Sequence, residues 1–544
     1  MEPAPELSPS AHLDTFCRDH LPPPRQWPEF EFTLPELHYP ERLNCATALL
    51  DGTIREFGAD RRCVLGSDER WTYGELLAHA NQIAHVLAGD LGMRPGQRVL
   101  LRGPNAPWLV ACWFGVVKAG GVVVTTPPML RSVELRKLLD LTGATIALCD
   151  HRFAPDLFDA TGPGTTTVLY GDGGPDDLRE RASRKPAEFT DVDTAADDVA
   201  VLAPTSGTTG VPKATMHFHR DVLAAADTFS AHIVRPEPDD VFTGTPPLGF
   251  TFGLGGLLIF PLRVGAATLL LEKPGIDAIA AAVREHGATV LFTAPTAYRA
   301  LLREGKADVL AGLRRCVSAG EHLPEWVWRE VRDRTGVRII DGIGATEMMH
   351  VFVSAADDDI RPGATGRAVP GYRAAVLDEG GRPVPDGTAG RLAVIGPTGC
   401  RYLADERQTQ YVRHGWNITG DIYVRDQDGY FWYQGRSDDM IVSAGYNIAG
   451  PEVEQALERH PDVAECAVIG LPDAERGMVV HAAVVLRPGV PEGEEKELEL
   501  IEHVKRLLAP YKHPRSIEFR EALPRTATGK VQRSKLREER VAAR

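Results

Sequence analysis

The alternation of short β-branched runs with helical patterns between residues 199 and 341 constrains the fold of this chain most strongly. The strand-like runs cover 199–203, 268–271, 288–292, 315–318 and 337–340, and the helical patterns cover 276–286 and 324–334. Strands that alternate with helices predict an α/β domain with doubly wound, mostly parallel sheets. Ligands of such sheets bind beyond the carboxyl ends of the strands. The segments that follow these runs are therefore candidate site residues.

The chain length predicts more than one domain. A chain of 544 residues is too long for a single hydrophobic core. Near residue 435 the pattern of apolar residues is interrupted, because the polar segment 435–439 has no apolar periodicity. Beyond it, Pro451 suits the first turn of a helix, and apolar residues from Leu500 onward have helical spacing. We expect a large N-terminal domain over residues 1–435 and a small α+β domain over residues 436–544.

The charge and the cysteines argue against several classes of protein. The net charge of −15 argues against nucleic acid or a membrane surface as the main partner. The eight cysteines are scattered without a C-x-x-C pair, which predicts neither a disulfide framework nor a zinc site. The N-terminus lacks the basic and apolar regions of a secretory signal, and the apolar stretches 108–124 and 253–271 are interrupted by charged residues and by glycine or proline. These features predict a cytoplasmic protein.

A loop rich in glycine and hydroxyl groups follows the first strand-like run. Its sequence over residues 205–213 is TSGTTGVPK, and the residues expected to contact phosphate are Thr205, Ser206, Gly207, Thr208, Thr209, Gly210 and Lys213. Glycines allow close backbone approach, and backbone N–H groups, hydroxyls and an ammonium together suit a phosphate. The loop differs from the common G-x-x-x-x-G-K-[ST] loop, because Lys213 comes third after Gly210. Taken alone, it is also consistent with a polar turn.

Three further segments carry side chains suited to nucleotide chemistry. Thr346 and Glu347 pair a hydroxyl with a carboxylate, which suits a phosphate oxygen and its Mg²⁺, although the same pair also suits a helix start. Asp421 follows a tight turn and suits either ribose hydroxyls or the turn itself. Lys530 stands in a second Gly/Thr loop, where an ammonium can stabilise developing charge or simply face solvent.

Six segments taken together closely resemble the adenylate-forming superfamily, which includes acyl-CoA synthetases, peptide-synthetase adenylation domains and luciferases. In chain order the segments are TSGTTGVPK, SAGE, DGIGATE, TGD, GRSDDMIVSAGYNI and PRTATGK, and the resemblance covers roughly residues 45–540. It implies a two-step reaction. A carboxylate attacks the α-phosphate of ATP and releases pyrophosphate, and a thiol, most often that of coenzyme A, then displaces AMP.

The resemblance implies roles for the phosphate-facing residues. The 205–213 loop would hold the β- and γ-phosphates of ATP. Thr346 would contact phosphate, and Glu347 would bind Mg²⁺. Lys530 would bridge the attacking carboxylate and the α-phosphate, which makes it the main catalytic cation of the first step.

The resemblance also implies an adenosine site. Its residues would be Gly320, Glu321, Asp341, Gly342, Ile343, Asp421 and Arg436. Asp341 would contact the adenine amino group, and residues 320–321 would flank the base. Asp421 and Arg436 would hold the ribose. Many members carry an aromatic residue at position 343 to stack on adenine, whereas this chain has Ile343, which retains an apolar contact.

A hinge and a tunnel for coenzyme A follow from the same resemblance. Asp438 matches the family hinge, about which the small C-terminal domain rotates between the two half-reactions. The rotation would remove Lys530 from the first site and bring Gly445 and Tyr446 to line the pantetheine tunnel.

Within the superfamily the chain looks most like CoA ligases of benzoate and 2-aminobenzoate (anthranilate). The cues are GIGATEMMH at 342–350, GFTFGLGG at 249–256 and the N-terminal arm DTFCRDHLPPPRQWPEF. By this analogy the ring would be surrounded by Phe250, Thr251, Phe252, Ala294, Gly320, Ile343 and His350. Two phenylalanines and several small residues suit a flat ring. His350 could bind an ortho amino or hydroxyl group, or could support the pocket from behind. Anthranilate is the first expectation, and benzoate and salicylate follow.

Three alternatives stay open at this point. The nearest is an aryl-acid adenylating enzyme that loads a separate carrier-protein thiol. A phosphate-loop hydrolase or kinase is disfavoured by the missing G-K-[ST] and by the second Lys loop. A non-catalytic binding protein is disfavoured by the joint presence of Lys213, Glu347, Asp421 and Lys530. The sequence does not decide between a monomer and a homodimer.

Overall fold

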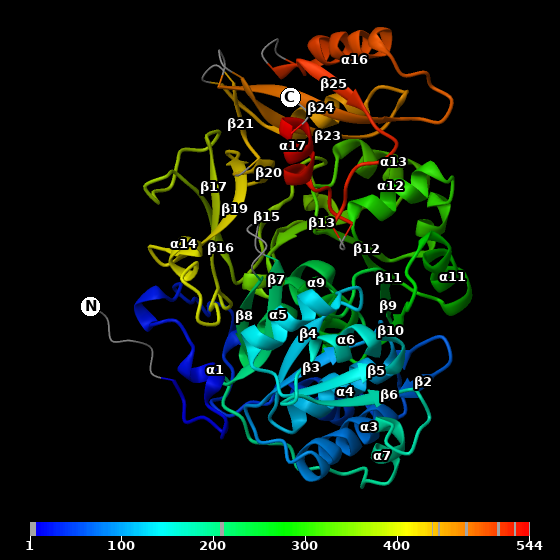
Figure 1. The fold of residues 1–544 in the computed structure, drawn as a ribbon, viewed down its shortest axis with the longest axis vertical. Coiled ribbons are helices and arrows are strands. Elements are labelled where there is room, and N and C mark those ends of the chain that lie inside the picture. The colour runs from blue at the N-terminus through cyan, green and yellow to red at the C-terminus, as the bar shows by residue number, and fades with distance from the viewer. Residues whose placement is uncertain are drawn as a thin grey trace. The chain divides into compact units, whose positions relative to one another are not determined.

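The chain forms two compact units, which are shown together in Figure 1. The computed structural model describes residues 7–206, 212–437, 439–443, 446–473, 477–508, 512–526 and 529–542. The large unit comprises Met1–Ala374 and Val394–Ile418, and the small unit comprises Ala375–Ala393 and Thr419–Arg544. None of the helices in the described ranges has the length and apolarity needed to cross a bilayer.

The first sheet of the large unit has six strands in the order β6-β5-β3-β4-β7-β8. They are β3 (Arg98–Arg102), β4 (Val122–Thr126), β5 (Ile146–Asp150), β6 (Thr166–Tyr170), β7 (Val199–Ser206) and β8 (Pro212–Phe218). All neighbours are parallel except β7 and β8, which form an antiparallel pair. Every residue of β3, β4 and β5 is buried, as expected for strands covered on both faces.

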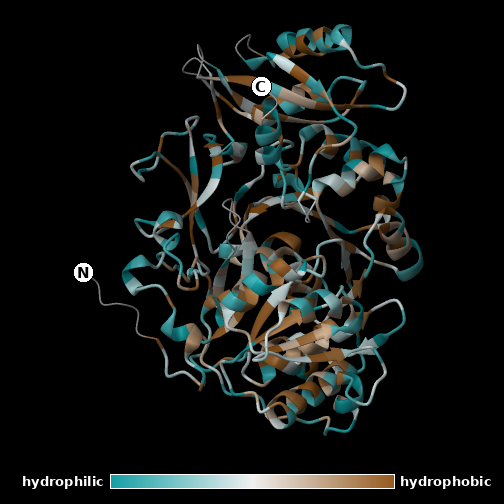
Figure 2. Cartoon of the chain, in the orientation of Figure 1, coloured by the Kyte–Doolittle hydropathy of each residue, from teal (hydrophilic) through white to brown (hydrophobic). Residues whose placement is uncertain are grey.

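Helices α4 (Pro107–Lys118), α5 (Ser132–Thr142) and α6 (Ala154–Ala160) belong to the part of the chain that forms this sheet, and α3 (Tyr73–His85) packs on α4. Thr72 starts α3 through a capping box, in which its hydroxyl accepts from the Glu75 N–H and the Glu75 carboxylate accepts from the Thr72 N–H. Helix α4 is buried along its whole length. Figure 2 shows the hydrophobic residues concentrated in these strands and the helices beside them.

The second sheet of the large unit has nine strands in the order β15-β14-β13-β12-β11-β9-β10-β1-β2. They are β1 (Arg62–Leu65), β2 (Arg70–Thr72), β9 (Val241–Gly244), β10 (Ala267–Leu270), β11 (Val290–Thr293), β12 (Arg315–Ala319), β13 (Ile339–Gly344), β14 (Val351–Ser354) and β15 (Arg367–Ala368). The six strands from β13 to β1 are parallel, and β2, β14 and β15 are antiparallel to their neighbours. Helices α11 (Ile276–His286), α12 (Pro295–Arg303) and α13 (Glu325–Thr335) connect its central strands.

The predicted α/β class with mostly parallel sheets is confirmed. Helix α11 has the predicted bounds, and α13 is shifted by one residue. The structure adds one difference, because the run 199–203 belongs to the first sheet and the later runs belong to the second. Thr205 and Lys213 therefore lie opposite each other in two antiparallel strands of the first sheet. Apolar periodicity identifies a strand but not its partners, which explains why the sequence did not separate the two sheets.

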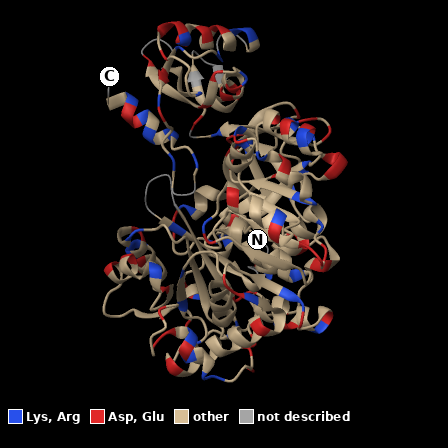
Figure 3. Cartoon of the chain, turned by 90° about the vertical axis from the view of Figure 1, so that its right-hand side faces the viewer, with Lys and Arg blue, Asp and Glu red and all other residues tan. Residues whose placement is uncertain are grey.

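Short helices lie between these elements and in the linking segments. They are α1 (Phe16–Asp19), α2 (Thr53–Phe57), α7 (Leu178–Ser183), α8 (His219–Ala225), α9 (Thr251–Leu254), α10 (Phe260–Arg263) and α14 (Gln408–Tyr411). Figure 3 shows acidic and basic positions interspersed over the outer helices.

A five-stranded sheet contains the points where the chain passes from one unit to the other. Its strands are β16 (Arg373–Leu377), β17 (Ala389–Ile395), β18 (Val412–Arg413), β19 (Trp416–Arg425) and β20 (Phe431–Arg436), with β20 paired to β19. The boundaries between the two compact units fall inside β16, β17 and β19. The boundary at residue 435, as the start of a moving domain, stays a prediction.

The C-terminal part of the small unit is the α+β arrangement that the sequence indicates. Its sheet contains β21 (Ile441–Ser443), β22 (Tyr446–Ile448), β23 (Val463–Asp473), β24 (Gly477–Leu486) and β25 (Ser516–Phe519). Its helices are α15 (Gly450–Glu458), α16 (Glu494–Leu507) and α17 (Arg533–Ala542). Leu500 and Val504 of α16 pack in one core with Val453 of α15. Pro451 lies in the first turn of α15, as expected.

Candidate nucleotide-binding and catalytic site

A lysine, a glutamate and a tyrosine meet in the large unit where the 205–213 loop joins β8. The Lys213 ammonium lies 3.0 Å from Oε1 of Glu347, and their side chains are only 16% and 9% exposed. The same ammonium donates to the Tyr402 hydroxyl, which in turn donates to Glu347 Oε1. Burial is the main cause that raises the pKa of Tyr402 well above its usual range, so this hydroxyl stays protonated. The carboxylate is thus held between two donors.

The turn that carries Glu347 is fixed by hydrogen bonds to the backbone on both sides of it. His217 of β8 bonds through Nε2 to the Thr346 carbonyl over 2.8 Å. Burial lowers the pKa of His217 to about 4, so the ring is neutral near pH 7 and Nε2–H is the donor. The Thr398 hydroxyl donates to the Met348 carbonyl over 2.8 Å. Met349 follows with φ 67°, a conformation that is costly for a long side chain and that needs such support.

The segment that carries Tyr402 lies beside β8 like an additional short strand. The Met216 N–H donates to the Arg401 carbonyl over 2.8 Å, and the Leu403 N–H donates to the Ala214 carbonyl over 2.9 Å. The Tyr402 N–H donates to Oε1 of Gln408 over 2.9 Å. Gln408 also donates to the backbone carbonyl of Gln26 in the N-terminal arm. The backbone of Tyr402 is therefore fixed on both of its edges.

A fully buried ion pair lies behind this segment. Nη1 of Arg401 is 2.7 Å from Oδ2 of Asp221, and neither side chain has any exposed surface. The guanidinium carbon lies 3.9 Å from the ring centre of Phe218 and 4.6 Å and 5.3 Å from those of Phe30 and Trp27. The N-terminal arm thus contributes two rings that cover the guanidinium next to Tyr402. Removing one partner of such a pair would leave an uncompensated buried charge.

The predicted phosphate loop is described only at its two ends. Thr205 in β7 is directly opposite Lys213 in β8. Gly207, Thr208, Thr209 and Gly210 lie outside the described residues, as does the side chain of Ser206. Of these two ends, Lys213 contacts Glu347 directly.

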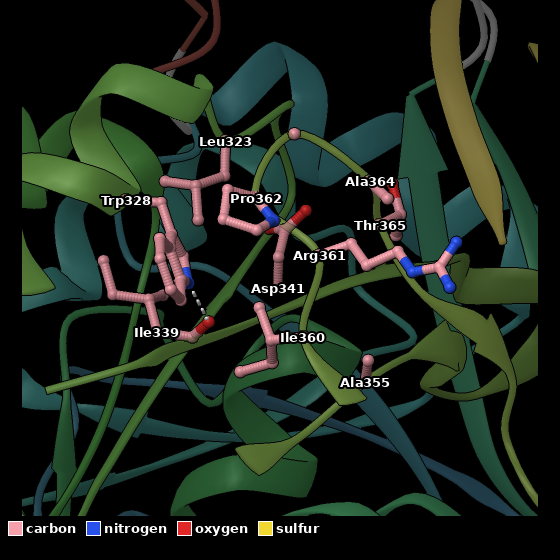
Figure 4. Close-up of a pocket in the computed structure, with 11 residues that line it drawn as sticks. Leu323, Trp328, Ile339, Asp341, Ala355, Ile360, Arg361, Pro362, Ala364 and Thr365 are labelled. Carbon is pink, nitrogen blue, oxygen red and sulfur yellow. Dashed lines mark hydrogen bonds between the residues drawn. The ribbon is translucent and has the colours of Figure 1, made fainter. Parts of the chain in front are cut away.

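The residues predicted to surround adenine follow β12 and β13. Asp341 lines a small pocket in which Leu323, Ile360 and Pro362 are close to its side chain (Figure 4). The Trp328 indole N–H donates to the Ile339 carbonyl over 2.9 Å at the side of this pocket. Oδ1 of Asp341 is buried and has no hydrogen-bond partner among the described residues. Burial raises the pKa of Asp341 to about 8, so its carboxyl group is mostly protonated at pH 7.

Gly320, Glu321, Gly342 and Ile343 occupy the same strand ends. Gly320 has φ 92° immediately after β12, a conformation that favours glycine. Glu321 accepts from the Thr296 hydroxyl over 2.7 Å and lies 3.6 Å from the Arg299 guanidinium. Gly342 and Ile343 are part of β13, and a Cβ on Gly342 would lie 2.7 Å from the Val351 side chain. The parallel sheet thus brings the predicted base-binding residues to one edge.

Two of the predicted aryl-pocket residues, Phe252 and His350, lie in a buried aromatic cluster. His350 lies among the rings of Phe229, Phe252, Phe260 and Phe292, at centre distances of 4.5–6.4 Å. Burial lowers the pKa of His350 to about 3, so the ring is neutral. Phe250 and Thr251 start α9, and Ala294 caps α12 directly after β11. A Cβ on Gly255 would lie 2.3 Å from Cδ2 of His350, so this glycine permits the close approach.

The small unit holds the predicted ribose residues together. Nη1 of Arg436 lies 3.3 Å from Oδ1 of Asp421, across the β19–β20 pair. Burial raises the pKa of Asp421, while Arg436 and Lys530 act in the opposite direction. A Cβ on Gly420 would lie 2.4 Å from Nη2 of Arg436, so a larger residue there would require the guanidinium to move.

Lys530 ends a tight turn in the same unit and is exposed. The Thr526 N–H donates to the Lys530 carbonyl over 2.7 Å, and Gly529 has φ 85°. The Lys530 N–H donates back to the Thr526 hydroxyl over 3.1 Å. The hinge residue Asp438 and the tunnel residue Gly445 lie outside the described residues, as does the side chain of Tyr446 at the start of β22.

Sequence reasoning missed three residues that organise the site. They are His217, Arg401 and Tyr402. A usable signal was present for Arg401, because a charged residue that is flanked by apolar and aromatic residues often marks a buried ion pair. No local signal identified Tyr402, since its partners Lys213 and Glu347 are distant in sequence.

The comparisons with known proteins identify the family of the chain. Residues 50–402 match the model of the family described as AMP-binding enzyme, and residues 452–530 match the model of the AMP-binding enzyme C-terminal domain. The benzoate–CoA ligase of Thauera aromatica is 36% identical over 518 residues, which are 93% of this chain and 98% of that protein.

Two solved structures are similar along most of the chain. The anthranilate CoA ligase AuaEII in complex with anthranoyl-AMP superimposes with a TM-score of 0.88 at 34% identity, covering 94% of this chain and all of the other. A benzoate CoA ligase from Burkholderia xenovorans LB400 superimposes with a TM-score of 0.84 at 33% identity, covering 91% and 100%. With its two matched regions, its fold and its site geometry, the chain belongs to the AMP-binding enzyme family.

Proposed function

We propose that this enzyme uses ATP to activate an aromatic carboxylic acid as an aryl-AMP and then transfers the aryl group to coenzyme A. In the first step a carboxylate oxygen bonds to the α-phosphorus and pyrophosphate leaves. In the second step the CoA sulfur bonds to the acyl carbon and AMP leaves. The observation that carries the proposal is the buried Lys213–Glu347 pair beside the phosphate loop, since it supplies a cation and a carboxylate for a metal-bound triphosphate.

In this proposal the large unit binds the triphosphate. The 205–213 loop and Lys213 bind the β- and γ-phosphates, and Thr346 contacts phosphate. Glu347 fits a Mg²⁺ ligand, because Mg²⁺ prefers one or two carboxylates together with phosphate oxygens. When bound, Mg²⁺ neutralises charge on the phosphates during displacement. Glu347, Tyr402 and Lys213 already form a network that fixes the carboxylate.

The proposal assigns the adenine base to residues at the strand ends of the large unit and, separately, the ribose to two residues of the small unit. We assign Asp341 to the adenine amino group and Ile343 with residues 320–321 to the faces and edge of the base. Oδ1 of Asp341 supports this role, because it is a buried acceptor without a partner among the described residues. Asp421 and Arg436 hold the ribose hydroxyls, which their mutual contact supports.

Lys530 stabilises the charge that develops between the carboxylate and the α-phosphate. After adenylation, residues 436–544 rotate about Asp438, which withdraws Lys530. The rotation brings Gly445 and Tyr446 to the pantetheine of coenzyme A. Support comes from the position of Lys530 in an exposed turn, where its side chain can serve one half-reaction without disturbing a core.

The acid is aromatic in this proposal, with 2-aminobenzoate as the first choice and benzoate or salicylate next. The similar proteins named above are ligases of benzoate and anthranilate. Phe252 supports an aromatic substrate, because its ring lies 5.6 Å from that of Phe292 and 5.5 Å from that of His350. Such a cluster favours stacked or edge-to-face contact with a flat ring.

A panel of acids tests the proposal. Pyrophosphate release would be measured with benzoate, 2-aminobenzoate, salicylate, 4-hydroxybenzoate and a medium-chain fatty acid, with and without free coenzyme A. We expect release that depends on an aryl acid, and thioester formation with free coenzyme A as the only thiol. Release without thioester would favour the carrier-protein alternative. Release from none of the acids would contradict the proposed function.

A further inference from the structure

We propose that Tyr402 is a positioning residue that holds Glu347 and Lys213 in the arrangement required for metal-bound ATP. The inference rests on the proposed function, because it concerns the same phosphate site. Tyr402 would touch neither substrate nor metal. It would act only through the carboxylate and the ammonium that it contacts.

The contacts of Tyr402 leave one carboxylate oxygen available. Both donors, the Tyr402 hydroxyl and the Lys213 ammonium, converge on Oε1 of Glu347. Among the described residues no hydrogen bond reaches Oε2. A carboxylate held in this way offers a single oxygen in a fixed direction. That presentation suits Mg²⁺, which requires near-ideal octahedral geometry and usually takes one or two protein carboxylates.

The hydroxyl also fixes the ammonium. Lys213 donates to the Tyr402 oxygen, and its Nζ lies 4.2 Å from the centre of the Tyr402 ring. A second ring, that of Tyr411, lies 5.6 Å from the same nitrogen. The lysine is therefore held at a defined distance from Glu347 instead of moving across both carboxylate oxygens. Without the hydroxyl, the ammonium would be free to bind Oε2 and compete with the cation.

Tyr402 is itself held rigidly enough to serve this purpose. Its N–H bonds to Gln408, and its flanking residues Arg401 and Leu403 pair with β8. Arg401 is anchored by the buried ion pair with Asp221. A group that orients a metal ligand contributes typically about 10–100-fold to metal affinity or activity.

The test compares Tyr402→Phe with a matched control, Tyr73→Phe. Tyr73 is also buried, and its hydroxyl donates to the Ala266 carbonyl over 2.6 Å, elsewhere in the large unit. Each variant of the full chain would be mixed with Mn²⁺ as a probe for Mg²⁺ and with a non-reactive α,β-methylene analogue of ATP. Electron paramagnetic resonance of free Mn²⁺ then gives the affinity of the ternary complex without turnover. Thermal unfolding of both variants reports any general loss of stability.

We expect Tyr402→Phe to lower the affinity for Mn²⁺ in the ternary complex by about 10–100-fold. Tyr73→Phe should leave this affinity unchanged, although both variants should lose a similar amount of thermal stability. When EDTA removes the metal, Tyr402→Phe should change the affinity for the ATP analogue less than it does when Mn²⁺ is present. A Tyr402→Phe titration that overlays the wild-type curve would overturn this inference alone. Wild-type protein that retains no Mn²⁺ with the analogue would overturn the proposed function as well.

Discussion

Two lysines of this protein, Lys213 and Lys530, have opposite surroundings. Lys213 is 16% exposed, pairs with Glu347 over 3.0 Å and donates to Tyr402. Lys530 is exposed at the end of a turn that backbone hydrogen bonds close. The first is part of a network that neighbouring side chains fix from several sides. The second stands on a turn of the small unit, where its charge acts to lower the pKa of Asp421.

The difference in burial between the two lysines indicates which of them can take part in only one of the two half-reactions. A buried, paired ammonium is preorganised, and moving it would leave Glu347 uncompensated. An exposed ammonium on a turn can be brought to a substrate and withdrawn at little cost to the core. The proposed division of labour assigns binding of the triphosphate to Lys213 and the charge that develops at the α-phosphate to Lys530.

The largest effect is expected for Lys530→Ala. Loss of one preorganised donor to developing charge lowers a rate by about 10²–10³-fold. Adenylate formation, measured as ATP–pyrophosphate exchange with aryl acid, should fall by that amount. Thioester formation from a pre-made aryl-adenylate should be largely retained. Lys535→Ala, which removes another exposed lysine of the small unit, is the matched control and should affect neither step. Equal losses in both half-reactions would contradict the rotation.

A second prediction contrasts Glu347, which has charged and polar partners, with Asp341, whose Oδ1 has none among the described residues. The folded-state pKa of Asp341 is about 8, against an ordinary value of 3.8. Between these values the unfolded chain has released the proton and the folded chain has kept it. Stability from this group is therefore lost as pH rises. Asp341→Asn has no such proton to lose, so its stability relative to wild type should increase with pH.

The difference should grow by about 2–3 kcal/mol between about pH 5 and about pH 7, since one pKa unit corresponds to about 1.4 kcal/mol. Urea unfolding of both proteins at the two pH values measures it, and other titrating groups cancel in the comparison. A stability difference that is independent of pH would show that Asp341 is ionised in the folded protein.

A third prediction measures the Lys213–Glu347 pair by a double-mutant cycle. Lys213→Met leaves the buried carboxylate without its cation, and Glu347→Gln leaves the ammonium without its anion. Residues in direct contact couple by about 0.5–3 kcal/mol, so the double variant should be less destabilised than the sum of the single variants. Unfolding in urea gives the three values. Strict additivity would mean that the two side chains do not interact in solution.

Much of this fold was predictable because its signals are local. Helix 276–286 has helical spacing and a glycine directly after it, and the structure has the same helix. The strands that end at Thr293 and Ala319 were also predictable from a local signal, which is a short buried run of apolar residues. What could not be predicted depends on pairing across the chain. The separation of β7 from the second sheet and its antiparallel partner β8 have no local signal.

The site shows the same limit. Lys213 and Glu347 were predicted because their segments have recognisable composition, and the structure brings their side chains within 3.0 Å of each other. Tyr402 was not found, because its importance comes from two partners that the fold brings to it. Residues that touch a ligand are often marked by motif, whereas residues that position them are marked only by contacts.

The smallest effect is expected for Gly255→Ala, which probes the aryl pocket. Gly255 has helical φ and ψ, so alanine is acceptable to the backbone, but its Cβ would lie 2.3 Å from Cδ2 of His350. The imidazole must shift, which should change binding of the aryl acid by about 1 kcal/mol, or about five-fold in KM. The KM for ATP should not change. Gly162→Ala, at an open position, is the control.

The pattern across acids decides what His350 does. The ring is buried and neutral, and its Nε2 lies 3.4 Å from the Phe252 carbonyl. If His350 contacts an ortho substituent, Gly255→Ala should raise the KM for 2-aminobenzoate more than that for benzoate, because only the first acid loses a hydrogen bond. If the ring only supports Phe252 and Phe260, both KM values should rise in parallel. Unchanged KM values for both acids would place the aryl site away from this aromatic cluster.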